Sequence, residues 1–104
     1  MSDRLRDRDG EAAAIFTSHG VLDATTTVLA ARVVGSETEA NPIVRELLAA
    51  GEIATILGIC ACVAVAAAAW PIAADALEAP GWVGLGIAAI GAAVAAVNLV
   101  VVFA

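Results

Sequence analysis

The sequence predicts an all-α integral membrane protein in which three transmembrane helices form an up-down-up bundle. Two observations support this prediction: 62% of the 104 residues are hydrophobic, and two long segments in the second half of the chain carry no charge. Globular domains are nearer to half apolar, and a helix needs about 20 mostly apolar residues to cross a bilayer. The apolar excess consists of alanine and valine, whereas a water-soluble core would need bulkier side chains. We therefore expect a multi-pass protein of the cell membrane.

A mobile polar tail is expected over residues 1–11, followed by a transmembrane domain over residues 12–104. The first span is placed at about residues 12–34. Its signal is the weakest of the three, because His19, Asp23 and an arginine interrupt the apolar residues.

The second span is expected at about residues 42–70. Asn41 and Pro42 mark its start, because asparagine caps helices and proline suits the first helical position. A continuous helix of this length would measure roughly 43 Å at about 1.5 Å per residue, which exceeds the roughly 30 Å hydrocarbon core of a bilayer. Either its first turns stand outside the bilayer, or the helix bends near Gly51.

The third span is expected at about residues 81–104, a segment without any charge. Trp70 and Trp82 flank the turn that precedes it, and tryptophan favours the membrane–water interface. The second and third spans should therefore form a helical hairpin. Three arginines lie in the tail and two, Arg32 and Arg45, fall on the opposite side of the membrane, which favours a cytoplasmic N-terminus.

Small residues recur at every fourth position in both apolar spans. Helices in lipid gain little from hydrophobicity, so small side chains that allow close backbone approach favour association. The predicted packing positions are Gly58, Cys62 and Ala66 in the second span, and Gly84, Ala88 and Ala92 in the third. They could face the other span or another protomer.

A polar cluster is predicted in the first span and on its neighbour. At about 100° per residue, one helical face carries His19, Asp23, Thr26 and Thr27. Asn98, the one amide of the third span, lies in the half of the membrane nearer the first link, within reach of Asp23. The cluster either fixes helix register through hydrogen bonds or forms a proton or cation site, since ionisable residues within a membrane are functional candidates by default.

Composition excludes several functions. The chain has five arginines, no lysine and eleven acids, a net charge of −6 that argues against nucleic acid as a partner. This acidic, alanine-rich usage is halophile-like. Common enzyme motifs are missing, and one histidine near one aspartate offers too few ligands for a metal. We therefore expect no enzyme, metal or cofactor, and interpret Cys60 and Cys62 as packing residues.

One resemblance follows from a motif of about twenty residues. "LDATTT" (22–27), then Gly35, then "EANP" (39–42), resembles a family of small uncharacterised prokaryotic membrane proteins with the pattern D-x-x-[ST]-T, a glycine, and E-x-N-P at the second helix. The resemblance implies three spans and singles out Glu39, Asn41 and Pro42. A lysine common in the family's second helix is missing here, which puts an ion pair of Asp23 in doubt, and His19 stands where the family usually has an asparagine. The family implies no activity.

The leading hypothesis is a non-enzymatic structural or accessory subunit of a membrane assembly. Its partners would be the lipid bilayer and either further copies of itself or a larger membrane protein complex. The alternative is an oligomeric ion or proton transporter or channel protomer that uses Asp23 and His19.

Overall fold

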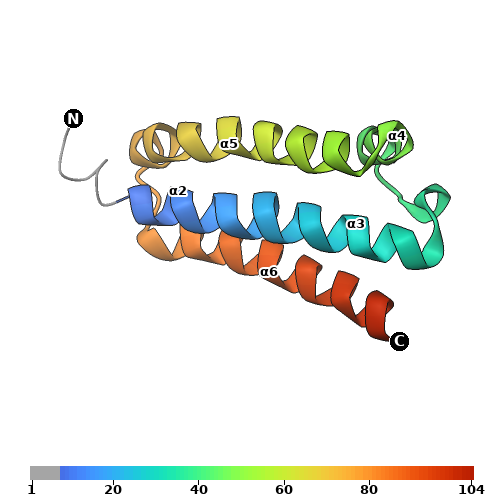
Figure 1. The fold of residues 1–104 in the computed structure, drawn as a ribbon. Coiled ribbons are helices and arrows are strands. Elements are labelled where there is room, and N and C mark those ends of the chain that lie inside the picture. The colour runs from blue at the N-terminus through green and yellow to red at the C-terminus, as the bar shows by residue number, and fades with distance from the viewer. Residues whose placement is uncertain (1–7) are drawn as a thin grey trace.

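A computed structural model of the protein describes residues 8–104, which are almost entirely helical and contain no strand. Three helical rods lie side by side in up-down-up order, and a short helix packs at one end (Figure 1). The first rod is formed by three segments that follow one another without a break in helical backbone angles. The elements are α2 (Asp9–Ile15), η1 (Phe16–Leu22) and α3 (Asp23–Val34) in the first rod, η2 (Ser36–Thr38), α4 (Pro42–Ala50), α5 (Glu52–Ala76) and α6 (Gly81–Phe103).

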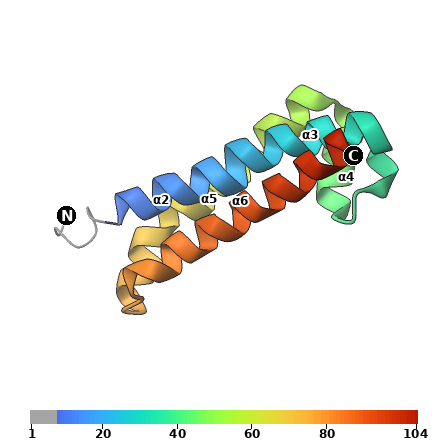
Figure 2. The ribbon, with the colours of Figure 1, turned by 90° about the horizontal axis from the view of Figure 1, so that it is seen from below.

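The first rod lies between α5 and α6 and holds them together (Figures 1 and 2). Both of these helices pack mainly on the first rod rather than on each other. Its middle segment, η1, is a seven-residue π-helix, a wider form than the α-helix that usually occurs as a single turn and often at functional sites. The apolar core is small and centres on Ile15, Ala67 and Ala88.

Among the described residues, two helices rather than the predicted three are long and apolar enough to cross a membrane. These are α5 and α6. The first rod does not qualify because η1 divides it and because its sequence includes His19, Asp23 and Arg32. The predicted tail also needs correction at its end. Residues 9–11 belong to α2, whereas residues 1–7 lie outside the described residues.

The predicted second span, residues 42–70, is two helices with different directions. The chain breaks at Gly51, whose φ of 137° is unfavourable for residues with a side chain. From there α4 lies back against α5, so that the Leu47 side chain fills the notch at Gly58, where an added Cβ would be 2.8 Å from Leu47 Cδ2. Of the two outcomes that the sequence left open, the chain takes the bend.

Both ends of α5 differ from the predicted ones. It begins at Glu52, and it continues past Trp70 through Pro71 to Ala76. The turn to α6 is therefore shorter than expected and consists of residues 77–80, with α6 beginning at Gly81 as predicted.

The face of α6 that packs inside the bundle follows a spacing of four, three and four residues. It consists of Gly84, Ala88, Gly91 and Ala95. A strict four-residue repeat drifts by about 40° per step around a helix of 3.6 residues per turn, so Ala92, unlike Gly84 and Ala88, is exposed. On α5, Gly58 is half-buried beneath Leu47, while Cys62 and Ala66 are exposed.

Close approach between α6 and the first rod depends on Gly91. A Cβ there would lie 2.7 Å from His19 Cδ2 and 2.8 Å from Ser18 Oγ. These distances are shorter than van der Waals contact, so any larger residue would push the helices apart.

Candidate functional site

Four of the predicted polar residues come together between α3 and α6. Asn98 Nδ2 lies 3.0 Å from Thr26 Oγ1, 3.3 Å from Thr27 Oγ1 and 3.5 Å from Asp23 Oδ1. Thr27 in turn donates to Asp23 Oδ1 at 3.3 Å. Thr25 is exposed and takes no part, as its helical position predicts. We call Asp23, Thr26, Thr27 and Asn98 the polar cluster.

The direction of the hydrogen bonds in the polar cluster follows from Thr26. Its hydroxyl donates to the carbonyl of Leu22, 2.7 Å away, so its oxygen can only accept from Asn98. The amide nitrogen of Asn98 has two hydrogens, which the two threonine oxygens can accept. The cluster therefore ties α3 to α6 while using one carboxyl oxygen of Asp23.

His19 lies near the polar cluster and also bonds to α6, but to its backbone rather than to Asn98. Its Nε2 is 2.7 Å from the carbonyl oxygen of Ile87 in α6. Because a carbonyl only accepts, Nε2 carries the proton, and Nδ1 of the neutral ring is then a bare acceptor. Nδ1 has no hydrogen-bond partner among residues 8–104. His19 and Asp23 are thus neighbours on the first rod, as predicted, but no hydrogen bond connects their side chains.

Two clefts flank the polar cluster. The first, which we call the α4 cleft, has a volume of about 290 Å³. It lies between α4, α5 and the first rod and is lined by His19, Asp23, Asn41, Ile43, Val44, Leu47, Gly58, Ile59, Cys62 and Val63. Its polar groups come from the first rod and from Asn41, and most of the remainder is apolar.

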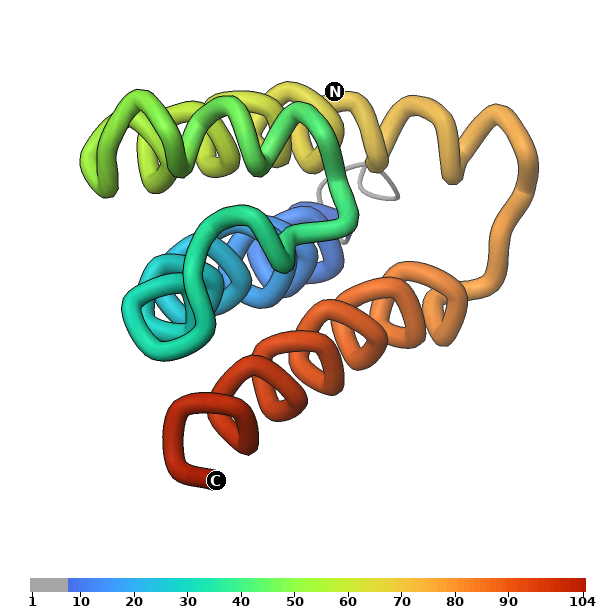
Figure 3. The backbone as a smooth tube through the Cα atoms, turned by 90° about the vertical axis from the view of Figure 1, so that its right-hand side faces the viewer, coloured from blue at the N-terminus to red at the C-terminus, as the bar shows by residue number. Residues whose placement is uncertain are grey.

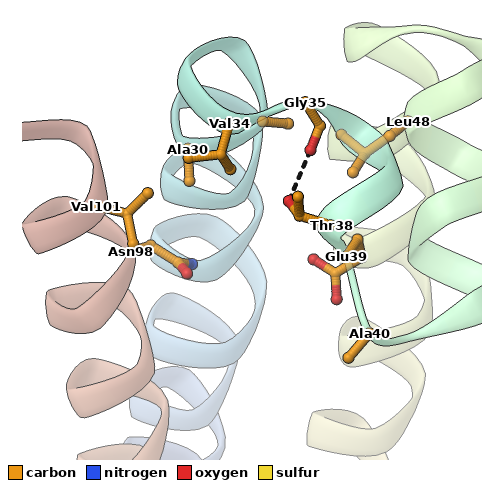
Figure 4. A pocket seen from close by; sticks show the side chains of 10 residues that line it. Ala30, Val34, Gly35, Thr38, Glu39, Ala40, Leu48, Asn98 and Val101 are labelled. Carbon is orange, nitrogen blue, oxygen red and sulfur yellow. Dashed lines mark hydrogen bonds between the residues drawn. The ribbon is translucent and has the colours of Figure 1, made fainter.

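The second cleft, which we call the loop cleft, has a volume of about 240 Å³ and includes Asn98 in its lining. Glu39 and Asn98 point toward one another across it, and Thr38 donates to the carbonyl of Gly35 at its rim, 2.8 Å away (Figure 4). The two clefts thus meet the polar cluster at different residues, one at Asp23 and the other at Asn98.

The predicted motif residues Glu39, Asn41 and Pro42 position α4 over the site. Asn41 Oδ1 accepts from the backbone nitrogens of Ile43 at 2.9 Å and Val44 at 3.4 Å, which is the expected cap. Glu39 Oε1 accepts from the Asn41 nitrogen at 3.1 Å. Viewed toward the end of the bundle, the chain leaves α3, turns and crosses to α4 over this region (Figure 3).

A charged cluster at the opposite end of the bundle was not predicted. Trp70 Nε1 donates to Glu11 Oε1 at 3.0 Å, and the Arg8 guanidinium contacts Glu11 at 3.4 Å and donates to the carbonyl of Ala79. Sequence reasoning had placed Arg8 and Glu11 in the tail. The acids Asp9 and Glu11 were the available signal, because acidic residues are enriched in the first turn of a helix.

At the link end, Arg32 and Glu52 form an exposed two-pronged ion pair. Arg32 Nη2 donates to Glu52 Oε1 at 2.9 Å, and Nε contacts Oε2. Both side chains are about half or more exposed, so solvent screens the pair and its contribution to stability is small. Arg32 is therefore engaged away from Asp23.

The site can accept hydrogen bonds but does not offer a metal-binding set. In the part of the chain that the structure describes, no three side chains of histidine, cysteine, aspartate or glutamate come close enough to hold a metal ion. The second oxygen of Asp23 and Nδ1 of His19 have no hydrogen-bond partner among residues 8–104, and both belong to residues lining the α4 cleft.

The fold and the site define a small all-helical protein with two helices of membrane-crossing length and composition, and with a polar cluster between its rods. The chain belongs to the DUF5658 family, described as a domain of unknown function, whose family model matches residues 14–104. This confirms the expectation of an uncharacterised family. Comparisons with curated proteins and with solved structures find no match.

Proposed function

We propose that this protein is a non-enzymatic structural or accessory subunit of a membrane assembly. The supporting observation is the exposure of its apolar helices. Only 17% of the most apolar stretch of α5, and likewise of α6, is buried. Large apolar side chains such as Val65 and Phe103 are 74% and 82% exposed. A surface of this kind suits lipid and neighbouring helices rather than water.

The proposal includes a third crossing by the first rod. This rod runs beside α5 and α6, so a bilayer that contains those two helices would contain most of it as well (Figure 1). Its threonines at positions 26 and 27 are buried, which keeps their hydroxyls away from lipid. The protein would then be a three-span protein of the cell membrane with its N-terminus in the cytoplasm.

The outer face of α6 is the proposed contact with a second copy or a larger complex. Ala92 and Ala96 are exposed, one turn apart, and small residues at this spacing allow close helix packing in lipid. Positions Gly84 and Ala88 of the same predicted stripe are used inside the bundle. The stripe therefore winds from the interior to the exterior of the molecule.

Cysteine crosslinking in native membranes tests this contact. With Cys60 and Cys62 replaced by alanine, a single cysteine at Ala92 should crosslink to a second copy or to a partner subunit. The control is a single cysteine at exposed Ile90, about 160° away around the helix at about 100° per residue. Equal crosslinking at both positions, or a monomer that purifies alone in mild detergent, would contradict the proposal.

A second candidate function is an oligomeric ion or proton transporter or channel protomer that uses Asp23 and His19. The observation that favours it is that Asp23, half-buried beside a cleft, forms no ion pair with any residue in the range 8–104. It predicts that Asp23→Asn abolishes flux in proteoliposomes and leaves the fold intact. No flux in the wild type, or unchanged flux in the variant, would remove this candidate.

A further inference from the structure

We propose that the α4 cleft binds a small primary ammonium ion that carries a short alkyl chain. The ammonium group would donate to Asp23 and to Nδ1 of His19, and the alkyl chain would lie against the apolar lining. This proposal gives the cation class for the second candidate function and shares only the location of the site with it, since binding does not require transport.

The carboxyl group of Asp23 supplies the charge. One of its oxygens accepts from Thr27, while the other has no hydrogen-bond partner among the described residues. The ionisable groups near enough to influence it are His19 and Glu39, neither of which is a permanent cation. A carboxyl group in such a place is stabilised when a cation is brought to it from outside.

The imidazole of His19 supplies a second hydrogen-bond acceptor for the ligand. Its Nε2 proton is held by the Ile87 carbonyl, so the neutral ring offers a lone pair at Nδ1. A lone pair of this kind is best satisfied by an N–H donor. Two acceptors on one wall, Asp23 and His19, therefore favour a ligand with several N–H bonds over a quaternary ammonium ion, which has none.

The rest of the lining sets the size and the apolar part of the ligand. Ile43, Leu47, Ile59 and Val63 form apolar walls, and Asn41 already uses its side-chain oxygen to cap α4. The volume of about 290 Å³ lies just below the range of about 300–1,000 Å³ that is typical of pockets for drug-sized ligands. A small monoalkylammonium ion fits this description better than a hydrated sodium or potassium ion, which would bring its water into an apolar space.

The segment that covers the cleft is lightly held. Residues 36–50 include no buried residue, and they are bounded by Gly35 and Gly51, whose φ angles are 91° and 137°. Leu47 contacts α5 in the Gly58 notch. Accommodation of a ligand would therefore involve a shift of this short helix at most, with the three rods left in place.

Binding can be measured by calorimetric titration of the purified full-length protein with n-butylammonium chloride. Tetramethylammonium, sodium and potassium chloride at the same ionic strength are the comparison ligands. We expect saturable binding of n-butylammonium and none of the others. Equal binding of tetramethylammonium or potassium would overturn the N–H requirement, and no binding of n-butylammonium would overturn the site.

Matched variants locate the site. Asp23→Asn should weaken the binding of n-butylammonium at least tenfold, while Glu37→Gln, which removes an exposed acid outside the cleft, should leave it unchanged. Cys62→Trp should block binding by filling the cleft without touching the polar cluster, whereas Ala66→Trp, one turn further along α5 and outside the cleft, should not. Binding that survives Cys62→Trp in a folded protein would place the ligand elsewhere. Binding without flux would uphold this site and remove only the transport function.

Discussion

Replacement of Gly91 by alanine tests the packing of α6 on the first rod. The new Cβ would lie 2.7 Å from His19 Cδ2 and 2.8 Å from Ser18 Oγ, so one of the two elements must move. Overpacking of this kind costs about 1–3 kcal/mol in the free energy of unfolding. It would also disturb the hydrogen bond from His19 to Ile87, because the same part of the imidazole ring is displaced.

Gly86 of the same helix provides the matched control. A Cβ at Gly86 meets nothing within 4 Å, so Gly86→Ala changes helix propensity and no contact. Alanine is more favourable than glycine within a helix by roughly 0.5–1 kcal/mol, and both variants gain this amount. The difference between them isolates the collision, and we expect Gly91→Ala to be less stable than Gly86→Ala by about 1–3 kcal/mol.

The measurement is reversible unfolding in mixed detergent micelles, monitored by circular dichroism, for both variants and the wild type under the same conditions. A Gly91→Ala variant that is as stable as Gly86→Ala, with neither variant destabilised, would refute the close approach of α6 to η1. A Gly86→Ala variant that is as destabilised as Gly91→Ala would show instead that glycine is required for a property of the whole helix, such as bending.

Three further predictions concern the other contacts between rods. Asn98→Ala should lower the free energy of unfolding by about 1–2 kcal/mol, because an average hydrogen bond between membrane helices contributes about 0.6 kcal/mol. The control Thr25→Ala should change the free energy of unfolding by less than about 0.5 kcal/mol. Equal effects of the two variants in the same unfolding assay would argue against the polar cluster. Glu11→Ala should cost about 1–3 kcal/mol by removing a charged acceptor, and should shift the fluorescence of Trp70 in a chain whose other tryptophan is replaced by phenylalanine; an unshifted emission would mean that the two side chains are not bonded. Gly58→Leu should displace α4 and increase proteolysis within residues 36–50, since the notch that receives α4 is lost; an unchanged cleavage rate would contradict the fold-back of that helix.

The features that the sequence predicted depend on short-range patterns. The helical class, the start of α4 at Pro42 and the start of α6 at Gly81 all follow from local composition and capping. The gathering of Asp23, Thr26 and Thr27 follows equally from helical spacing, and the up-down-up order places Asn98 at their level. These expectations required no knowledge of how the rods pack.

The bend near Gly51 was one of two predicted outcomes, but the sequence could not decide between them because the fold-back of α4 depends on a contact between two helices. A glycine within a membrane helix is common and does not by itself end the helix. Gly51 ends it here with a φ of 137°, and the α4 that results is held by Leu47 against Gly58. The α4 cleft depends on the same contact, so the sequence could not predict it either.

The sequence predicted the buried residues in the first half of α6 but not those in its second half. A repeat of four residues describes Gly84 and Ala88, but packing against a neighbouring rod follows the true helical period, and the buried positions move on to Gly91 and Ala95. Because alanine and glycine are so frequent here, both patterns fit the sequence. The packing partner decides between them.

The polar cluster has two kinds of contact, and their separation bears on its role. Its inward hydrogen bonds, from Asn98 to Thr26 and Thr27, connect α3 to α6 and would suffice for a purely structural purpose. The second oxygen of Asp23 adds nothing to that connection. An apolar residue or a second threonine would hold the helices without the cost of placing a carboxyl group in a half-buried position. Asp23 lines the α4 cleft, so the side chain whose presence helix packing explains least is also the one that borders a cleft, as the proposed ammonium site requires.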